Sequence, residues 1–268
     1  MNWDYYKDKV IWITGASSGI GAAMAQALSK KTLTLILSAR NSTKLKEVRE
    51  QCDPSATIHI IELDLSEHDE LSVVFDNHKS LLSQVDIMIH NGGISQRSLA
   101  EETNFSVLKK LMDVNYLGTS KLSLSLLPYF IKRRSGHFVV ISSIAGKVGV
   151  PLRSGYSASK FALHGFFDAL RAEQVDNNID VTIICPGYIH TDISKHAMTG
   201  DGKKQGTMDS AQLNGMNVDT FVGKALSAIS EKKAEVYIGG FKETKLAVFV
   251  SKMFPALFRK IISKSKVT

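Results

Sequence analysis

A tyrosine and a lysine stand four residues apart in the segment Tyr156-Ser157-Ala158-Ser159-Lys160. In a helix this spacing places both side chains on one face. A phenol ordinarily has a pKa of about 10, and a nearby ammonium group favours its ionised form. The pair could therefore exchange a proton with a substrate oxygen. Because tyrosine–lysine pairs at this spacing are also common on protein surfaces, the residues around them decide the interpretation.

A serine thirteen residues before this tyrosine could act on the same oxygen. Ser143 follows an apolar run typical of a buried strand, and open parallel sheets bind ligands at the carboxyl ends of their strands. Its hydroxyl could donate a hydrogen bond to the carbonyl that Tyr156 protonates. Because side chains alternate along a strand, we expect only one of Ser142 and Ser143 to face the site. The spacing to the tyrosine favours Ser143.

The first strand-like run leads into a glycine-rich segment, Thr14-Gly15-Ala16-Ser17-Ser18-Gly19-Ile20-Gly21, and a helical pattern follows. Gly15 permits a tight turn, Gly19 lets the backbone approach a pyrophosphate, and Gly21 lets the helix pack closely on the strand. The N–H groups at the start of the helix would then face the phosphates. The segment predicts a dinucleotide site, although such turns also serve as plain connections.

The residues after the second strand-like run distinguish NAD from NADP. NAD sites usually place an acidic residue there to bind the ribose 2′-hydroxyl, whereas this chain has Leu37-Ser38-Ala39-Arg40-Asn41. The guanidinium of Arg40 can pair with a 2′-phosphate. We therefore expect NADP(H) as the cofactor. The alternative is that Arg40 is only a solvated charge in a loop.

Short apolar runs alternate with helical patterns along the chain, as in folds with a parallel sheet and right-handed crossovers. The predicted fold class is α/β: a single-domain, doubly wound parallel sheet (Rossmann fold) of about seven strands with helices on both faces, over residues 1–241. The expected strands are Val10–Thr14, Leu33–Ser38, Thr57–Leu63, Val85–His90, His137–Ser142, Asp180–Cys185 and Glu235–Gly239.

Two further segments carry specific expectations. A helix is expected at Ser66–Leu82, with Ser66 as its N-terminal cap and Asp69 three residues later. Residues 189–217 contain four glycines and few apolar residues. Because so long an irregular segment in a compact domain is usually functional, we expect a substrate lid there.

The positive charge is concentrated near the C-terminus. The chain has 268 residues and a net charge of +7, and residues 242–268 hold seven Lys or Arg and one acidic residue. The near-neutral remainder argues against nucleic acid as a partner. Apolar residues recur at helical spacing from Leu246 to Ile262, so we expect a basic amphipathic helix over 242–268, kinked or broken at Pro255. It could cover the substrate cleft, pack against another subunit or attach to an anionic membrane.

Composition limits the remaining classes of protein. Two cysteines, Cys52 and Cys185, are too few for a disulfide framework. No His, Cys, Asp and Glu residues have the spacing of metal ligands, so no metal is expected. Neither a secretion signal nor a run of about 18 uncharged apolar residues is evident. We expect a cytoplasmic protein, and peripheral membrane contact through the C-terminal helix is one of the alternatives left open for that helix.

Together these residues resemble the motifs of the short-chain dehydrogenase/reductase family, of the NADP-preferring type, over roughly Lys9 to Gly240. The matching positions, in order and at the family's spacing, are Thr14–Gly21, Asp64, Asn91-Gly92-Gly93, Asn115, Ser143, Tyr156, Lys160 and Pro186-Gly187-Tyr188-Ile189-His190-Thr191. The resemblance implies a Rossmann fold, a nicotinamide cofactor and assembly as a homodimer or homotetramer.

The resemblance implies a role for each catalytic position. Tyr156 would be the general acid in reduction and the general base in oxidation. Lys160 would lower the pKa of the tyrosine and hold the nicotinamide ribose, while Ser143 would orient and polarise the substrate carbonyl. Asn115 would hold a water that relays protons through Lys160 to solvent.

The resemblance also implies contacts with the cofactor. Asp64 and the Leu65 backbone would contact the adenine, and Asn91 would lie near its ribose. Ile189 and Thr191 would fix the nicotinamide carboxamide. The complete set expected to bind NADP(H) is Gly15, Ser17, Ser18, Gly19, Ile20, Gly21, Arg40, Asp64, Leu65, Asn91, Gly92, Tyr156, Lys160, Pro186, Gly187, Ile189 and Thr191.

Two positions depart from the family pattern. His90 stands where the family commonly has the first of two asparagines, and we expect it to be a structural residue at a strand end. Ser18 stands where many NADP-using relatives carry a basic residue, so Arg40 would make most of the contact with the 2′-phosphate.

The expected function is that of an NADP(H)-dependent oxidoreductase that interconverts a hydrophobic secondary alcohol and its ketone or aldehyde by hydride transfer. Apolar residues expected near the cavity mouth indicate a hydrophobic substrate: Val148, Val150, Leu152 and Tyr188. The alternative is a non-catalytic Rossmann protein that binds the cofactor for regulation. Such proteins usually lose the serine, tyrosine or lysine that this chain keeps.

Overall fold

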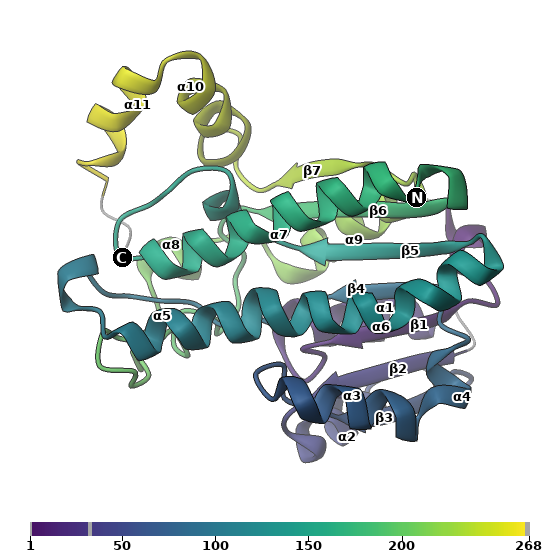
Figure 1. Ribbon diagram of the computed structural model, residues 1–268. Coiled ribbons are helices and arrows are strands. Elements are labelled where there is room, and N and C mark those ends of the chain that lie inside the picture. Colours follow the sequence, from purple (N-terminus) through teal and green to yellow (C-terminus); the bar gives the residue numbers. More distant parts are fainter. Residues whose placement is uncertain (1, 32–33, 266–268) are drawn as a thin grey trace.

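A computed structural model describes residues 2–31 and 34–265. Its centre is a sheet of seven parallel strands in the order β3-β2-β1-β4-β5-β6-β7, with helices on both faces (Figure 1). The strands are β1 (Val10–Thr14), β2 (Thr34–Ala39), β3 (Thr57–Glu62), β4 (Ile87–His90), β5 (Gly136–Ile141), β6 (Ile179–Pro186) and β7 (Glu235–Ile238). This arrangement confirms the predicted single-domain, doubly wound fold. Leu33, the expected first residue of the second strand, lies outside the described residues.

The helices form a layer on each face of the sheet. One layer contains α1 (Gly19–Ser29), α2 (Ser42–Glu50) and α9 (Val218–Ser230), and the other contains α3 (His68–Asn77), α6 (Gly118–Arg133) and α7 (Ser154–Glu173). The shorter helices are α4 (Lys79–Leu82), α5 (Phe105–Met112), α8 (Ser210–Leu213), α10 (Ala247–Met253) and α11 (Pro255–Ile262).

The two cores follow from the two-residue period of the strands. Trp12, Ile36 and Phe138 point to the layer of α3, α6 and α7 and are fully buried. Their neighbours Ile11 and Leu35 point to the opposite layer and are equally buried. Because both faces are covered, the inner strands β1, β2, β4 and β5 are buried at nearly every position, as the sequence indicates. The edge strand β3 instead has exposed positions.

The expected capping of a helix by Ser66 is wrong. Helix α3 begins at His68, its N-terminal flanking residue is Glu67, and no side chain caps it. The Ser66 hydroxyl instead donates a hydrogen bond to Asp64 (2.7 Å), whose carboxylate also accepts from the Ser66 backbone N–H. Ser66 therefore belongs to a tight turn with Asp64 after β3, and its hydroxyl does not cap α3.

Residues 189–217 connect β6 to α9 mostly without regular structure. Within this segment the structure has the four-residue helix α8 and isolated bridges, one from Ile189 to Met216 and another from Gln96 to Met198. The second bridge ties the segment to the loop that follows β4. The segment thus lies across the carboxyl edge of the sheet, while its role as a lid stays a prediction.

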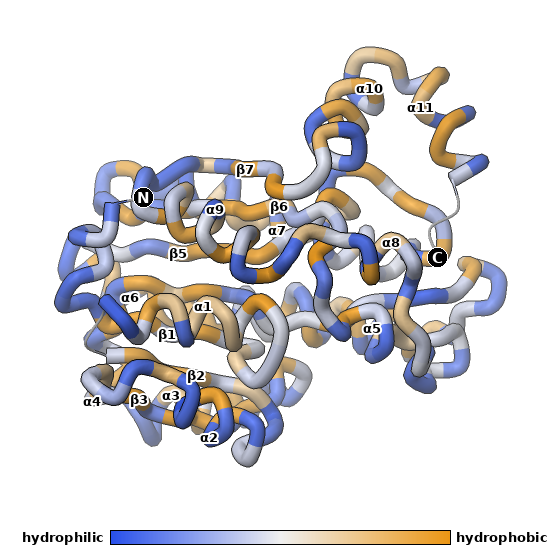
Figure 2. The backbone as a smooth tube through the Cα atoms, turned by 180° about the vertical axis from the view of Figure 1, so that it is seen from behind, coloured by the Kyte–Doolittle hydropathy of each residue, from blue (hydrophilic) through white to orange (hydrophobic). Residues whose placement is uncertain are grey.

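The described part of the C-terminal segment forms a π-helical turn, Lys242–Leu246, followed by the short helices α10 and α11, which project from the body of the protein (Figure 1). Helices α10 and α11 are separated at Phe254, and Pro255 occupies the start of α11. The break expected at this proline is therefore present. Orange apolar and blue polar stretches alternate along the pair (Figure 2). Among the described residues, no helix has the length and apolar character needed to cross a membrane.

The stability of the core can be tested at Phe138, which is fully buried between β4, α6 and α7. Phe138→Ala should lower the free energy of unfolding by about 3–5 kcal/mol, because it removes a ring and leaves a cavity. Phe105, which is 79% exposed, is the matched control, and Phe105→Ala should change stability by less than about 0.5 kcal/mol. Equal urea midpoints for the two variants would contradict the assigned core.

Candidate active site

The glycine turn after β1 has the backbone that a dinucleotide turn needs. Gly15 and Gly19 adopt positive φ angles of 64° and 54°, where side chains are strained. A Cβ atom on Gly21 would lie 2.3 Å from the carbonyl oxygen of Gly15, so α1 could not pack against the turn with any side chain there. The backbone at Gly15, Gly19 and Gly21 therefore has the conformation or the close packing that the sequence analysis expects of each glycine.

Asn91 and Leu65 support this turn from the neighbouring strands. The Asn91 amide donates hydrogen bonds to the carbonyls of Thr14 (3.2 Å) and Gly15 (3.0 Å). The Leu65 side chain occupies the space beside Gly92, where a Cβ atom would come within 2.6 Å of it. The glycine at position 92 therefore makes room for the Leu65 side chain.

The turn fits a dinucleotide phosphate. Ser18 precedes α1 in an extended conformation and makes no side-chain cap, so the helix N-terminus is not covered by its own cap residue. The Thr191 side chain, from the loop after β6, lies about 3.4 Å from the position of a Cβ on Gly19. The expected phosphate and nicotinamide residues thus face each other across one site.

Arg40 and Asp64 follow β2 and β3, the strands on the other side of β1 from the catalytic residues. The Arg40 side chain is 63% exposed, and its Nη1 lies 3.9 Å from a carboxylate oxygen of Asp64. This is a weak, solvated ion pair. The Arg40 side chain is consequently accessible to a phosphate.

Ser143, Tyr156 and Lys160 come together at the carboxyl end of β5. Ser143 follows the strand and starts a 3-10 turn, where its Oγ accepts from the Ala145 N–H (3.1 Å). The Ser143 side chain lies close enough to the Tyr156 phenol to lower its pKa. Lys160 Nζ lies 5.9 Å from the centre of the tyrosine ring and donates to the Ile141 carbonyl (2.9 Å). The three residues expected to carry the chemistry are therefore neighbours.

Burial and charge oppose each other at the catalytic phenol. Burial raises the pKa of Tyr156, while the hydrogen bond with Ser143 and the positive charges of Arg153 and Arg97 act in the opposite direction. Burial also lowers the pKa of Lys160 to about 8. The sequence indicates Lys160 as the cation that acidifies the phenol. Arg153 and Arg97, which the sequence analysis did not single out, act on the phenol in the same direction.

Asn115 lies in a π-helical turn, Asp113–Leu117, between α5 and α6. Such turns are frequent at functional sites. Its side chain accepts from the Ile94 N–H (2.8 Å) and donates to the Ile94 carbonyl (2.9 Å) and to Ser159 (2.9 Å). A Cβ atom on Gly93 would lie 3.1 Å from Asn115 Oδ1 and 3.5 Å from Lys160 Nζ, so the two groups flank the same glycine.

Ser142 and His90 have structural partners. Ser142 points away from Ser143, and its Oγ lies 3.1 Å from His164 Nε2, as strand alternation requires. His90 Nε2 is hydrogen-bonded to Ser123 (2.8 Å), and burial lowers the pKa of this histidine to about 3. A neutral, buried imidazole matches the structural role expected for His90.

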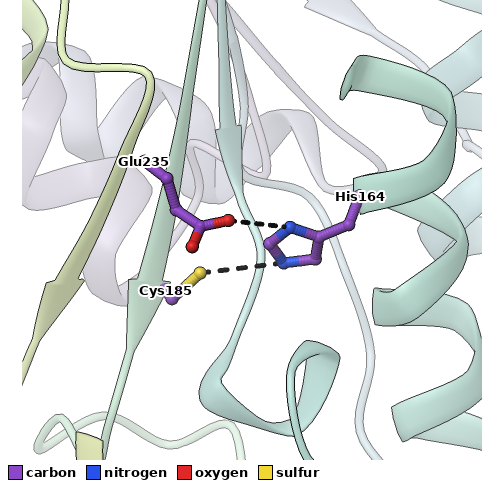
Figure 3. A group of neighbouring side chains, drawn as sticks. All are labelled: His164, Cys185 and Glu235. Carbon is purple, nitrogen blue, oxygen red and sulfur yellow. Dashed lines mark hydrogen bonds and ion pairs between the residues drawn. The ribbon is translucent and has the colours of Figure 1, made fainter. Parts of the chain in front are cut away.

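Behind the site, His164, Cys185 and Glu235 bring ligand-type atoms within 4.8 Å of one another. The imidazole lies between its partners: Nε2 is 3.7 Å from Cys185 Sγ, and Nδ1 is 3.3 Å from Glu235 (Figure 3). One metal ion cannot bind both nitrogens of a ring, and the Lys147 ammonium lies 2.8 Å from the same carboxylate oxygen. The group is a buried polar network that ties β7 to α7.

A cavity of about 290 Å³ opens beside Tyr156. Residues expected from the motifs line one part of it, namely Ile20, Ser143, Pro186, Gly187, Ile189 and Thr191. Val148, Val150 and Tyr188 also line it, as expected, but Leu152 does not. The Leu152 carbonyl instead accepts a hydrogen bond from the Ser98 N–H (3.1 Å).

Several residues of this cavity carry no motif and escaped the sequence analysis. Arg97 and Arg153 belong to its wall, with Asp209 buried behind them. Gln96 accepts hydrogen bonds from the N–H groups of Gly155 (2.8 Å) and Tyr156 (3.2 Å), which fixes the first turn of α7. The sequence shows only that the loop after β4 contains polar residues. No sequence spacing indicates that these residues contact α7, so the sequence analysis could not identify them.

Known proteins are similar to this chain in sequence and in fold. A family model described as short chain dehydrogenase matches residues 9–201. Dehydrogenase/reductase SDR family member 7B of Xenopus tropicalis is 39% identical over 261 residues, covering 95% of this chain and 84% of the relative. A Drosophila melanogaster SDR family protein 7-like is 37% identical over 264 residues, covering 97% and 81%.

Solved structures have the same fold. A short-chain dehydrogenase from Streptomyces avermitilis is 25% identical with a TM-score of 0.79, and 96% of each chain is covered. A short-chain dehydrogenase from Sphingobium yanoikuyae, in complex with NADPH, is 23% identical with a TM-score of 0.77 and the same coverage. With the family model and the relatives, these findings show that the chain belongs to the short-chain dehydrogenase/reductase family of oxidoreductases.

Proposed function

We propose that this protein is an NADP(H)-dependent oxidoreductase that interconverts a hydrophobic secondary alcohol and its ketone or aldehyde. The observation that carries the proposal is that Ser143 and Tyr156 both line one largely apolar cavity, with Lys160 Nζ 5.9 Å from the centre of the phenol ring. The cavity extends to Ile20 of the glycine turn, so a carbonyl and a nicotinamide would meet there.

The cofactor would be held by the residues of the glycine turn and by the loop after β6. The glycines leave the start of α1 open, where it would bind the pyrophosphate, and the exposed Arg40 side chain would pair with the 2′-phosphate. Asn91 acts by holding the turn, since its amide is bonded to the carbonyls of Thr14 and Gly15. When bound, the nicotinamide supplies the hydride in reduction and accepts it in oxidation.

In reduction, negative charge develops on the substrate oxygen. Ser143 and Tyr156 donate hydrogen bonds to this oxygen and so stabilise the charge in a buried site, where such bonds are strong. Tyr156 then transfers its proton to the oxygen. In the reverse direction the phenolate removes the proton, and the nearby cations stabilise the phenolate.

Lys160 and Asn115 restore the proton. Both lie beside Gly93, and we assign to Asn115 the water that passes protons from solvent to Lys160. The lysine also positions β5, because its ammonium is bonded to the Ile141 carbonyl two residues before Ser143.

Residues 189–217 act as a lid in this proposal. Ile189, Thr191, Ile193 and Gln212 line the cavity from this segment. Gln212 donates to the Ile189 carbonyl, which holds the two ends of the segment together. A non-catalytic regulatory role is not favoured, because no catalytic residue is missing.

We also propose a dimer that uses α6 and α7. Leu117, Leu124 and Ile131 recur every seven residues and are 42%, 54% and 37% exposed, and Phe161 on α7 is 45% exposed. Seven-residue spacing places these side chains, which belong to α6 and to the π-helical turn directly before it, in one stripe, a surface typical of contacts between helices.

The C-terminal helices attach the protein to an anionic membrane surface in this proposal. Phe249, Met253, Phe254, Leu257 and Ile261 are each more than half exposed. The described residues from 242 onward include six Lys or Arg and one acid, Glu243, whose carboxylate accepts from backbone N–H groups. Apolar side chains ringed by cations match a lipid headgroup boundary. The expected cytoplasmic localisation stays a prediction.

Replacing the phenol tests the catalytic assignment. Tyr156→Phe should lower kcat for ketone reduction by about 10²–10⁴-fold, because it removes the proton donor. NADPH binding, followed by its fluorescence, should persist. Tyr129→Phe, a change at a half-buried tyrosine of the α6 layer, should leave kcat within about twofold. Near-normal turnover by the Tyr156 variant would refute the role of the phenol.

Cofactor choice depends on Arg40. Arg40→Ala should raise the KM for NADPH by about tenfold or more, because a charge-assisted contact is lost, and change the KM for NADH much less. Arg49→Ala, at an exposed arginine on α2, should alter neither value. Parallel increases in both KM values after the Arg40 change would contradict the 2′-phosphate contact.

Membrane attachment can be measured by sedimentation with phosphatidylcholine vesicles that contain or lack phosphatidylserine. The protein should sediment with the anionic vesicles and be released by salt. Changing Phe249, Met253 and Leu257 together to serine should weaken binding about tenfold or more, whereas Phe105→Ser should not. If the triple variant binds as before, or if it changes only the oligomer mass, the helices contact another partner.

A further inference from the structure

The first turn of α7 holds the catalytic tyrosine, but the residue before the helix does not cap it. The helix begins at Ser154, so Gly155 and Tyr156 are its second and third residues. N–H groups at these positions have no partner within a helix and are usually satisfied by the side chain that precedes the helix. Here that side chain belongs to Arg153, which makes no capping bond, since a guanidinium group has donors only. An acceptor must therefore come from another part of the chain.

Gln96 supplies this acceptor. Its Oε1 accepts hydrogen bonds from the N–H groups of Gly155 (2.8 Å) and Tyr156 (3.2 Å). The glutamine belongs to the loop after β4, is fully buried, and lies 59 and 60 residues before its two partners. It thus caps α7 in the way that an adjacent serine or aspartate caps other helices.

The other half of the Gln96 carboxamide fixes its orientation. Its Nε2 donates to Ser98 Oγ (3.1 Å) and to Thr103 Oγ1 (3.1 Å). The Thr103 hydroxyl gives its own proton to the Leu99 carbonyl (2.6 Å) and so presents a lone pair to the amide. A carboxamide has two N–H donors and an oxygen that accepts two bonds, and all four are used here. A buried polar group that is fully satisfied in one orientation is held rigidly.

The loop that carries Gln96 is fastened on its other side by the segment 189–217. The Met198 N–H donates to the Ser95 carbonyl (2.8 Å), and the Met198 carbonyl accepts from the Arg97 N–H (2.8 Å). These two bonds flank Gln96. Ser95 and Arg97 line the cavity, whereas Gln96 does not, as the alternation of an extended chain requires. Any effect of the glutamine on the reaction therefore passes through α7.

The start of α7 is packed closely around this contact. A Cβ atom on Gly155 would lie 2.6 Å from Leu108 Cδ2 of α5 and 3.2 Å from Gln96 Oε1, so the glycine lets both approach. Tyr156 follows directly, and its ring belongs to a small apolar cluster with residues of α5. The backbone and the ring of the tyrosine are thus held separately. Since a displacement of about 1 Å can cost about 10²-fold in rate, a loose first turn would be expensive at the phenol.

We propose that Gln96 is a positioning residue for the reaction: by capping α7 from the loop after β4, it holds the Tyr156 phenol at its place in the cavity wall. Gln96 itself touches neither substrate nor cofactor. The inference deepens the proposed function and rests on it for the role of the phenol, while the cap can be tested without turnover.

Hydrogen exchange tests the cap. In the NADPH-loaded protein, followed by mass spectrometry, Gln96→Met should speed amide exchange in the first turn of α7 about tenfold or more, because methionine fills the same space without an acceptor. Gln96→Glu keeps an acceptor oxygen and should exchange nearly as the parent does. Gln51→Met, at an exposed glutamine after α2, is the matched control and should change nothing there. Unchanged exchange in Gln96→Met would refute the cap.

Kinetics test the positioning, with 2-decanone and acetophenone among a panel of ketones. Gln96→Met should lower kcat about tenfold or more while the Kd for NADPH, followed by its fluorescence, stays within about twofold. Gln96→Glu should restore most of kcat. A methionine variant with normal kcat, a glutamate variant as slow as the methionine variant, or a loss of kcat matched by the loss of NADPH affinity would each overturn the proposal.

Two further results keep the outcomes distinct. Gln96→Asn has an amide that can still bind the hydroxyls but falls short of α7, so it should repeat the loss of kcat and keeps the test open should the methionine variant unfold. If the parent reduces no ketone, or if Tyr156→Phe is as active as the parent, the proposed function fails, and the exchange rates alone then decide whether Gln96 caps the helix.

Discussion

The site depends on one buried phenol that must both keep and release a proton. Burial alone would leave the Tyr156 hydroxyl too weak an acid for catalysis near neutral pH, because it disfavours the charged form. The Ser143 hydroxyl and the arginine charges act against this effect, and Lys160 stands behind the ring. The rest of the fold can be understood as the means of holding these groups around one oxygen.

The parallel sheet makes that arrangement possible. All seven strands end at the same edge, so the glycine turn after β1, the catalytic serine after β5 and the loop after β6 meet there. The contacts between them are close: Gly21 packs on the Gly15 carbonyl, and Asn91 of the next strand binds the same turn. The network of His164 and Glu235 supports the opposite side of β5 through Ser142.

The cavity combines an apolar surface with a positively charged one. Its apolar part is closed in part by Phe258 and Ile262 of the C-terminal helix α11, whose other side chains are exposed. Its polar part contains Arg97 and Arg153 next to the phenol. In the proposed function, α11 belongs both to the substrate cavity and to a surface that meets lipid, which would bring a hydrophobic substrate directly to the site.

The sequence by itself determined the features that depend on residues a few positions apart. The glycines at 15, 19 and 21, the pair Tyr156 and Lys160 on one helix, and the alternation of buried strands are local patterns, and the structure has them where they were expected. Tertiary structure decided the contacts between distant segments. Arg97 and Asp209 are 112 residues apart and Arg153 and Asp209 are 56 apart, and no periodicity connects them. Ser66 does not cap the helix as expected, because its hydroxyl donates a hydrogen bond to Asp64 instead. Local propensity therefore defines the elements, but the charge around the phenol is set only when the loops close over the sheet.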